Sequence, residues 1–465
     1  MKIFNVMTRK KQEFVPHEEG KVKIYACGIT VNGDAHLGHA RQAIVFNMIS
    51  EYFRFLGYDV TYVRNYTDID DKIIAQASQM GILPLELSDL RIKQTDETMS
   101  RILTCDADYK PRVSQYIPQI VEFISGLIEK GFAYEVGGEV YFSVNKFGGY
   151  GKLSNRNTKD MLNGVRIEEN ESKAEALDFA LWKGVTAEEF GWDSPWGKGR
   201  PGWHIECSAM NLAAFGDQID IHGGGRDLIF PHHENEIAQT EALTGKQFVK
   251  YWTHNGLIKV NGQKMSKSLG NSLLLADLLE KYSDEAIKYA LLQTNYRGDI
   301  NITDDLFPMA EGHIRNFYKL MGTVYALNLP ATAEDEEAAK KIDDEFNACM
   351  ADDFNTALAL SNLFGYAKEI NKFIAAKDGK ATAYAKQIQK TYALLGVFTR
   401  TPEEYAALFA EEESGIPADV QAIAEERWAA RQNRDWAKSD ELRDKLSSMG
   451  YAVKDSKTGY ELTKI

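Results

Sequence analysis

A strand, a glycine-containing loop and a helix follow one another near the amino end, and this order restricts the fold more than any other feature. Residues Lys21 to Cys27 (KVKIYAC) are rich in β-formers and predict a strand that ends at Cys27. The loop from Gly28 to Gly38 leads into a helix with apolar periodicity, expected to begin near His39. A second apolar strand is expected from Asp59 to Arg64. These elements form a βαβ unit of a parallel sheet, in which ligands bind at the carboxyl ends of the strands.

The pattern changes twice further along the chain. A helix from Val113 to Lys130 and a hairpin from Phe132 to Val144 interrupt the sheet pattern. Residues Leu306 to Thr399 are almost continuously helical in period, and a break at Glu411 to Pro417 precedes a last small segment. We therefore predict an α/β protein, with a Rossmann-type parallel sheet domain that contains an insertion, then an α-helical bundle and a small C-terminal domain. The predicted boundaries are 1–111 and 200–305 for the two halves of the sheet domain, 112–199 for the insertion, 306–410 for the bundle and 411–465 for the last domain.

The charge of the chain argues against binding nucleic acid through bulk positive charge. Its 54 basic and 68 acidic residues give a net charge of −14 at pH 7, so such binding would need local basic patches. No apolar run approaches the roughly 18 to 20 residues of a membrane span, and the first residues lack the apolar core of a signal peptide. The four cysteines lie far apart, which argues against a disulfide scaffold and leaves metal ligation or burial. We expect a cytoplasmic monomer that binds no membrane.

The sequence His36-Leu37-Gly38-His39 stands where the first loop meets a helix. Free N–H groups and the helix dipole favour a phosphate at such a position, and Gly38 allows a nucleotide to lie close to the backbone. Two imidazoles there can donate hydrogen bonds to phosphate oxygens as charge develops. By itself the tetrapeptide fits equally well two surface histidines that cap a helix.

A second basic motif, Lys264-Met265-Ser266-Lys267-Ser268, follows a strand-like segment and a turn at Asn261-Gly262. Lysines on either side of a serine suit a clamp that closes on a triphosphate. Taken separately, the motif also fits a solvated basic turn.

Together and in this order, HLGH and KMSKS resemble the two ATP-binding motifs of class I aminoacyl-tRNA synthetases. Further blocks narrow the resemblance to the cysteinyl-tRNA synthetases, and these blocks span nearly all of the first 300 residues. The blocks are CGITV from Cys27, HLGHAR from His36, NYTDIDDKII from Asn65, PGWHIECSAM from Pro201, IHGGGRDLIFPHHENEIAQ from Ile221, and KMSKS. The resemblance implies that the sheet domain is catalytic and that the last domain binds an anticodon.

The resemblance also implies one zinc ion per chain. On spacing alone, two buried cysteines and a surface His–Glu pair at i, i+4 are the simpler interpretation. The family's ligand positions fall on Cys27, Cys207, His232 and Glu236. Zinc binds a thiol as a thiolate, which separates cysteine from serine more strongly than the tenfold to roughly two-hundredfold that an apolar pocket reaches. His233 is expected to point elsewhere on the helix, as a group at the helix end or one that contacts a ligand from outside.

Three further residues are assigned to the substrate sites. Trp203 would form a wall of the cysteine pocket, although ordinary core packing is the alternative. Thr30 is assigned to the cysteine site beside Cys27. Asp227 follows three glycines, where a carboxylate can accept ribose hydroxyls, although a turn or helix cap fits too. One departure from the family is Asn32-Gly33, which stands where most members carry an aromatic residue.

The predicted activity is that of a ligase that activates L-cysteine with ATP, accompanied by Mg²⁺, and transfers it to the cysteine tRNA. Catalysis then needs positioning and charge stabilisation, assigned to His36, His39, Lys264 and Lys267. Gly38, Asp227 and Lys267 are assigned to ATP binding. Two alternatives remain, namely a cysteine ligase of mycothiol biosynthesis that acts on an amino-sugar, and an inactive synthetase-like binding protein. The long region after Leu306 argues against the first, and the intact motifs argue against the second.

The charge changes sign near the carboxyl end. Residues 401–426 contain eight acidic and no basic side chains, whereas 427–465 contain nine basic and six acidic ones. A stripe along one helix face is predicted to bind RNA, and it consists of Arg427, Arg431, Arg434 and Lys438. The alternative is a solvated helix whose arginines pair with acidic neighbours. For Trp428 and Trp436 we expect core packing rather than base stacking.

Overall fold

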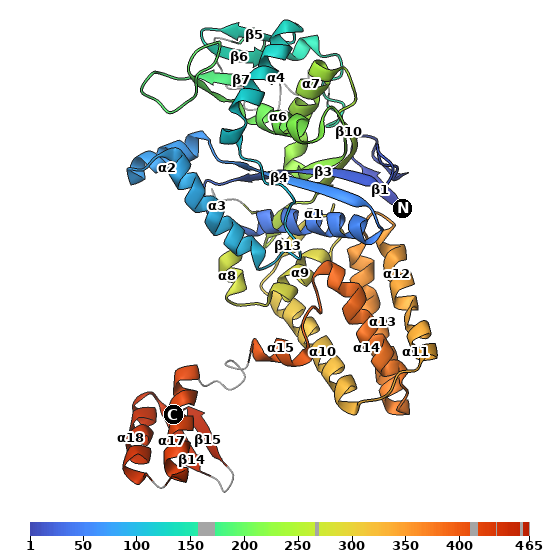
Figure 1. Ribbon diagram of the computed structural model, residues 1–465, viewed down its shortest axis with the longest axis vertical. Helices are drawn as coiled ribbons and strands as arrows, with labels where there is room; N and C mark the ends of the chain where they lie inside the picture. The colour runs from blue at the N-terminus through green and yellow to red at the C-terminus, as the bar shows by residue number, and fades with distance from the viewer. Residues whose placement is uncertain (157–172, 266–268, 410–416, 434, 456–458, 465) are drawn as a thin grey trace. The chain divides into compact units, whose positions relative to one another are not determined.

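The computed structural model describes residues 1–156, 173–265, 269–409, 417–433, 435–455 and 459–464 (Figure 1). The chain forms two compact units. The first unit comprises Met1–Ile314 and Asn328–Thr399, and the second comprises Arg315–Leu327 and Arg400–Ile465. This division is coarser than the five predicted segments, which therefore remain a prediction.

A four-stranded parallel sheet lies at the centre of the first unit, in the order β10-β9-β3-β4. Its strands are β3 (Lys21–Thr30), β4 (Asp59–Thr67), β9 (Ile219–Gly225) and β10 (Val249–Asn255). Helix α1 (Leu37–Phe55) connects β3 to β4 and completes the expected βαβ unit. The prediction that the first strand ends at Cys27 is wrong, because β3 continues to Thr30 past a register shift between Ala26 and Ile29.

The inserted segment forms a small antiparallel sheet in the order β5-β6-β7-β8. Its strands are β5 (Ala133–Val136), β6 (Glu139–Phe142), β7 (Phe179–Gly184) and β8 (Gly199–Pro201). The expected helix begins later than Val113, because a 3₁₀ turn η1 (Val113–Gln115) precedes α4 (Ile117–Glu129), with Pro118 in its first turn. The insertion shares one hydrophobic core with the central sheet, in which Trp182 packs in the same cluster as Cys27 and Cys207.

Several elements surround the carboxyl ends of the central strands. Helix α6 (Trp203–Phe215) precedes β9, and the turns η3 (Arg226–Leu228) and η4 (Ile229–His233) lead from β9 into α7 (Glu234–Thr244). The hairpin β1 (Lys2–Asn5) and β2 (Lys10–Glu13) packs against β10. The remaining elements of this part are α2 (Asp71–Met80), α3 (Pro84–Ser100), η2 (Val144–Lys146), β11 (Ile258–Val260), β12 (Gln263–Lys264), α8 (Leu275–Leu279), α9 (Asp284–Leu292) and β13 (Ile300–Ile302).

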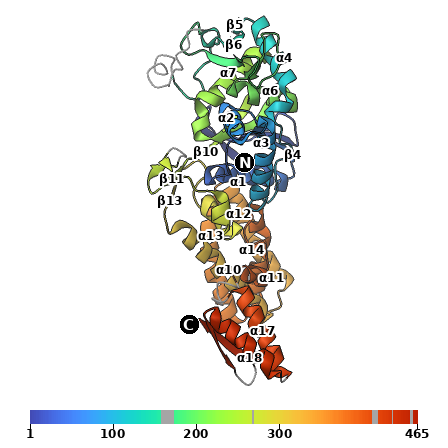
Figure 2. The same ribbon diagram turned by 90° about the vertical axis from the view of Figure 1, so that its left-hand side faces the viewer.

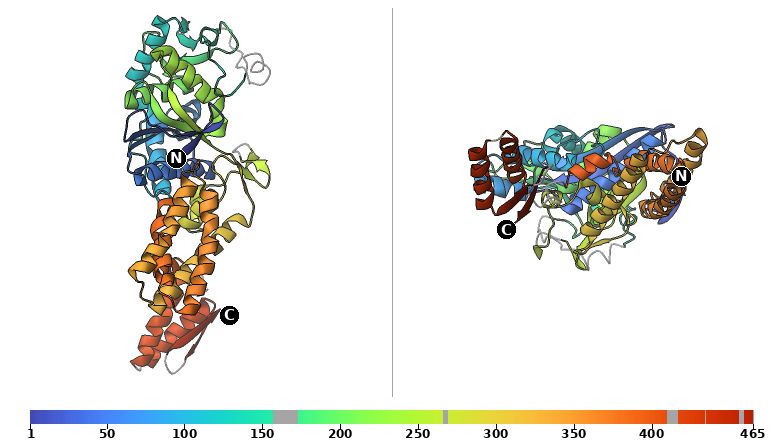
Figure 3. Two further views of the ribbon diagram at one scale, coloured as in Figure 1. Left: turned by 90° about the vertical axis from the view of Figure 1, so that its right-hand side faces the viewer. Right: turned by 90° about the horizontal axis from the view of Figure 1, so that it is seen from below.

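The chain from 306 to 399 is helical, as its periodicity predicts. It contains α10 (Leu306–Leu327), α11 (Ala333–Ala339), α12 (Lys341–Met350), α13 (Thr356–Ala376), α14 (Lys380–Tyr392) and the turn η6 (Ala393–Leu395). Helices α12, α13 and α14 lie side by side within the first unit (Figures 2 and 3). Among the described residues, no helix is both long and apolar enough to cross a membrane.

The second unit ends in a small α+β module. Helix α15 (Pro402–Ala407) precedes this module in the second unit. The module consists of α17 (Ala418–Gln432), α18 (Trp436–Ser448) and a hairpin of β14 (Tyr451–Asp455) and β15 (Tyr460–Lys464). Val420, Ala424, Leu446 and Tyr451 form its hydrophobic core.

Candidate functional site

His36 caps the amino end of α1. Its Nδ1 accepts hydrogen bonds from the backbone N–H of Gly38 at 3.1 Å and of His39 at 3.4 Å. The Nδ1 of His39 in turn accepts from the backbone N–H of His36 at 3.4 Å, and the two rings stack with centroids 3.6 Å apart. Because each Nδ1 acts as an acceptor, a neutral ring carries its proton on Nε2. With this tautomer, Nε2–H is the donor of each neutral ring.

A cleft of about 540 Å³ opens beside this helix end. Residues that were predicted to bind the nucleotide line this cleft, namely His36, Gly38, His39, Asp227 and Lys264. Thr30, at the end of β3, also lines it. A Cβ on Gly38 would lie 3.0 Å from the His36 ring, so a side chain there would crowd the cap. Lys267, also assigned to ATP, lies outside the described residues.

The Asn32-Gly33 turn is attached to the start of α2. The side-chain amide of Asn32 donates to Asp70 Oδ2 at 3.4 Å, and the backbone carbonyl of Asn32 accepts from Gln76 Nε2 at 3.2 Å. Asp70 also caps α2 by accepting from the Ile73 N–H at 2.7 Å. Asn32 itself lines the cleft, so at this departure from the family an amide faces the nucleotide-sized space.

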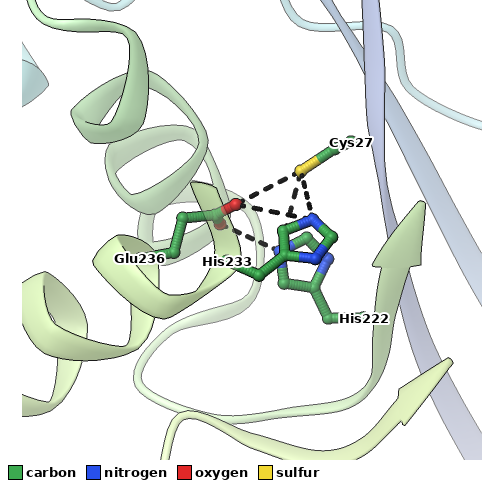
Figure 4. A group of neighbouring side chains, drawn as sticks. All are labelled: Cys27, His222, His233 and Glu236. Atoms are coloured by element: carbon green, nitrogen blue, oxygen red, sulfur yellow. Dashed lines mark hydrogen bonds and ion pairs between the residues drawn. The ribbon is translucent and has the colours of Figure 1, made fainter. Parts of the chain in front are cut away.

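Two overlapping groups of potential metal ligands lie buried near the carboxyl end of β3. One is the predicted set, and the other replaces Cys207 and His232 by His222 and His233; both contain Cys27 and Glu236, and in each the ligand atoms lie within 4.8 Å of one another. Figure 4 shows the second group, drawn from β3, β9, η4 and α7. The expectation that His233 points elsewhere on the helix is wrong, because its Nε2 lies 3.2 Å from Cys27 Sγ, while a role outside the ligand set stays a prediction.

The distances in the predicted set are those of groups that share one centre. Cys27 Sγ lies 3.6 Å from Cys207 Sγ and 3.2 Å from Glu236 Oε1. His232 Nε2 lies 3.1 Å from the same carboxylate oxygen, across the i, i+4 spacing that the sequence predicts. In the alternative set, His222 Nε2 lies 2.9 Å from Glu236 Oε2. Glu236 therefore holds ligands from both sets.

The electrostatics of the cluster favour an anionic ligand at Cys207 and at Glu236. A hydrogen bond from Cys27 lowers the pKa of Cys207 to about 6. Burial alone would raise the pKa of the Glu236 carboxyl, but His222 and His232 hold that pKa well below its usual value. Burial raises the pKa of Cys27, and the neighbouring Cys207 and Glu236 raise it further, which favours a neutral thiol at this position. Thiol, imidazole and carboxylate are ligands that zinc accepts, so the donor set fits a zinc ion.

Further hydrogen bonds orient the imidazoles from behind. His232 Nδ1 lies 2.9 Å from His204 Nδ1, and His233 Nδ1 lies 2.7 Å from His254 Nε2. His222 Nδ1 lies 2.7 Å from the carbonyl oxygen of Tyr25. Such outer contacts fix the tautomer and orientation of a ligating ring. Neither His222 nor His254 was predicted to belong to this site; the available clue was their position on neighbouring strands, His222 in the middle of β9 and His254 near the end of β10.

Trp203 does not line the cleft beside α1. Its ring centroid lies 4.4 Å from that of His232, and its side chain is 46% exposed. It lines a separate cavity of about 480 Å³, together with His204, Phe230 and Asn235. The ring thus contacts a residue of the ligand cluster without lining the nucleotide cleft.

The predicted basic stripe is divided in the second unit. Arg427 is 2% exposed and pairs with both oxygens of Asp455, at 2.8 and 2.9 Å. This burial argues against Arg427 as a contact for RNA. Lys438 pairs with Glu426 at 2.6 Å on the surface, and Arg434 lies outside the described residues.

An aromatic surface adjoins Arg431. The Trp436 side chain is 56% exposed, which contradicts the expected core packing, and the Arg431 guanidinium lies 5.6 Å from its ring centroid. Trp428 is half-buried and contacts Tyr460 at 6.0 Å between ring centroids, as a core residue would.

Comparisons with known proteins cover nearly the whole chain. Residues 13–312 match the model of the tRNA synthetases class I (C) catalytic domain, residues 345–399 the DALR domain, and residues 413–461 the cysteinyl-tRNA ligase anticodon binding domain. The chain is 45% identical to a cysteine–tRNA ligase of Shouchella clausii over 468 residues, covering 99% of this chain and 98% of the relative. It is 44% identical to a cysteine–tRNA ligase of Geobacter sulfurreducens, with the same coverage. A Mycobacterium tuberculosis methionyl-tRNA synthetase in complex with methionyl-adenylate shares the fold, with a TM-score of 0.60 and 14% identity over 81% of this chain and 89% of that one.

Proposed function

Because the chain belongs to the cysteine–tRNA ligase family of class I aminoacyl-tRNA synthetases, we propose that it activates L-cysteine with ATP and transfers it to tRNA(Cys). The observation that carries this proposal is the position of Cys27. It lies in the buried thiol, imidazole and carboxylate cluster, while the neighbouring Gly28 and Thr30 line the cleft that starts at His36. A thiol-binding centre and a nucleotide-sized cleft therefore meet along one strand.

In the first step the carboxylate of cysteine attacks the α-phosphorus of ATP in line, and pyrophosphate leaves. This reaction needs no nucleophile from the protein, so the enzyme contributes positioning and charge stabilisation. We assign Nε2–H of His36 and His39 to the phosphate oxygens, and Lys264 and Lys267 to the charge that moves toward pyrophosphate. Gly38 gives the nucleotide access to the helix end, and Mg²⁺ accompanies ATP.

Asp227 is assigned to the ribose hydroxyls, because it lines the cleft just beyond β9. Thr30 lines the cleft and is assigned to the bound cysteine. Trp203 is assigned to the wall of the cysteine site through its contact with His232. These roles rest on placement, and each is testable by substitution.

We further propose that Cys27, Cys207, His232 and Glu236 hold one zinc ion per chain. When bound, zinc would take the substrate thiol as a thiolate, which a serine hydroxyl or an alanine methyl matches poorly. The protein's own contribution is a buried cluster in which Glu236 stays ionised and hydrogen bonds with His204 and His254 orient the imidazole rings of His232 and His233. Four protein ligands usually mark a closed site, so substrate binding would require an expanded coordination shell.

We assign tRNA binding to the C-terminal module. The proposal keeps Arg431, Arg434 and Lys438, and it omits Arg427 because that guanidinium is buried against Asp455. The match of 413–461 to an anticodon binding domain disfavours a ligase that acts on an amino-sugar. Intact HLGH and KMSKS motifs disfavour an inactive relative.

One assay separates these possibilities. Exchange of pyrophosphate into ATP is measured with each of the twenty amino acids, and only cysteine should support it. Transfer of the activated amino acid is then measured with tRNA and with an amino-sugar, and only tRNA(Cys) should accept it. Activation of another amino acid, or transfer to the amino-sugar, would contradict the proposal. We also propose a cytoplasmic monomer organised in the five predicted segments, and sedimentation should give about the 52.3 kDa of one chain.

A further inference from the structure

A basic cavity lies on the other side of the turn that carries Asp227. Its volume is about 300 Å³, and Arg9, Arg226, Arg297 and His254 line it together with Phe4 and Ser154. The turn after β9 separates it from the nucleotide cleft, because Gly225, Asp227 and Leu228 line the cleft whereas Arg226 and Ile229 line this cavity. No residue lines both spaces, so the cavity is a distinct site.

Positive charge exceeds negative charge around the cavity. Arg226 and Lys259 share one carboxylate, Asp299, at 3.3 and 3.1 Å. Arg297 pairs with Asp353 at 2.8 Å, and the described residues offer Arg9 no carboxylate but only the backbone carbonyl of Ser154, at 3.3 Å. Two of the three arginines that line the cavity thus pair with a carboxylate, and the Glu234 carboxylate accepts from the backbone N–H groups of Leu153 and Ser154, which also line it. A guanidinium has five N–H donors, so these contacts leave donors of Arg9 and Arg297 available to a ligand.

The arginines are held in place by packing. Arg297 stacks on the Phe4 ring, with its guanidinium carbon 4.2 Å from the ring centroid. Arg226 donates to the backbone carbonyl of Arg297 and so ties the turn after β9 to the segment before β13. Side chains fixed in this way lose little entropy when they bind an anion.

His254 supplies an independent indication of a missing ligand. It is 3% exposed, and its Nε2 is used in the contact with His233. Its Nδ1 is buried without a hydrogen-bond partner within the described chain. Buried polar atoms of this kind are rare unless a ligand or an ordered water satisfies them.

We propose that this cavity binds a phosphate group, held by Arg9, Arg226 and Arg297. Arginine forks match the tetrahedral oxygens of phosphate by paired hydrogen bonds. The phosphate can come from a free anion such as inorganic phosphate or from the backbone of a bound RNA. A free anion would fill the cavity whether or not the chain is a ligase, so this site does not depend on the function proposed above.

The test compares Arg9→Gln with Lys10→Gln in the full-length, zinc-loaded protein. Both substitutions remove one exposed positive charge, but Lys10 does not line the cavity. A non-reactive cysteinyl-adenylate analogue occupies the nucleotide cleft, and inorganic phosphate is titrated by calorimetry. We expect Arg9→Gln to weaken phosphate binding about tenfold or more, as loss of a charge-assisted hydrogen bond does. Lys10→Gln should stay within about twofold, as a screened surface charge. Arg226→Gln is the second variant, in case Arg9→Gln does not fold.

A second arm identifies the source of the phosphate. Binding of tRNA(Cys) to the same variants is measured over a range of salt concentrations. If the RNA backbone supplies the group, Arg9→Gln weakens tRNA binding and lowers the salt slope by about one. If a free anion supplies it, tRNA binding is unchanged while phosphate binding falls. The proposal is overturned if the arginine variants match Lys10→Gln in both measurements.

Discussion

Replacing Arg41 with lysine should destabilise the first unit although the positive charge is kept. Arg41 lies on α1 and is 0% exposed. Its Nη1 donates to the carbonyl oxygens of Gly256 and Leu257, both at 2.9 Å, and its Nη2 donates to those of Tyr296 and Gly298. Burial lowers its pKa to about 10, so the guanidinium remains charged at pH 7.

The size of the effect follows from the number of acceptors. An ammonium has three donors and no fork geometry, so at least one of these four hydrogen bonds is lost. The carbonyls of Gly256, Leu257 and Tyr296 also accept from other groups, so the cost is that of the lost bonds themselves. A hydrogen bond from a charged group contributes about 1.5 to 3 kcal/mol, and the remaining bonds weaken, so we expect a loss of about 2 to 4 kcal/mol. The clamp also joins two chain segments in close contact, since a Cβ on Gly256 would lie 2.0 Å from the Gly298 carbonyl oxygen.

Scanning calorimetry and ATP kinetics measure this prediction. The loss corresponds to a fall in Tm of about 2 to 5 °C for a unit of this size. Because Gly256 and Leu257 line the nucleotide cleft, KM for ATP should also rise. Arg101→Lys is the matched control, because Arg101 is 48% exposed and pairs with Glu280 on the surface, where such pairs contribute about 0 to 1 kcal/mol. An Arg41→Lys protein with the Tm and the KM for ATP of the control would refute the reasoning.

Four further predictions concern the proposed sites. Cys207→Ser should raise KM for cysteine far more than KM for ATP and should reduce zinc content, measured by pyrophosphate exchange and elemental analysis; equal changes in both KM values would contradict the pocket assignment. Lys267→Ala should lower kcat for adenylate formation about a hundredfold or more, as loss of transition-state charge stabilisation does, and an unchanged kcat would remove it from catalysis. Arg431→Glu should weaken tRNA binding in a salt-dependent way while cysteine activation is kept, and filter binding that matches the parent protein would exclude this contact. Arg427 lowers the pKa of Asp455 below its usual value, so the pair should stabilise the C-terminal module above about pH 4, and this contribution should disappear as pH falls through the lowered pKa. Amide hydrogen exchange in β14 should therefore be faster in the Asp455→Asn variant than in the parent at pH 7, and the two rates should be equal in acid. Parallel pH profiles of the two proteins would count against the pair.

Local features of this protein could be predicted from its sequence, because they depend on neighbours along the chain. The start of α1 at the HLGH motif follows from capping and from apolar periodicity, and the helices between 306 and 399 follow from the same periodicity. The i, i+4 pair His232 and Glu236 shares a helical face whatever the rest of the fold does. Family resemblance then linked these features to cysteine and ATP.

Contacts between distant segments were decided by the tertiary structure alone. Pairing of β3 with β9 brings Cys27 and His222 within 3.9 Å, although 195 residues separate them in sequence. His233 shares a helical face with Glu236 at the i, i+3 spacing, but only the tertiary structure brings Cys27 Sγ within 3.2 Å of its ring. Arg427 is buried because the β14–β15 hairpin brings Asp455 to it. A periodic pattern specifies which face of an element is apolar, but strand order and hairpin placement depend on packing over the whole chain, and these decide which polar groups meet.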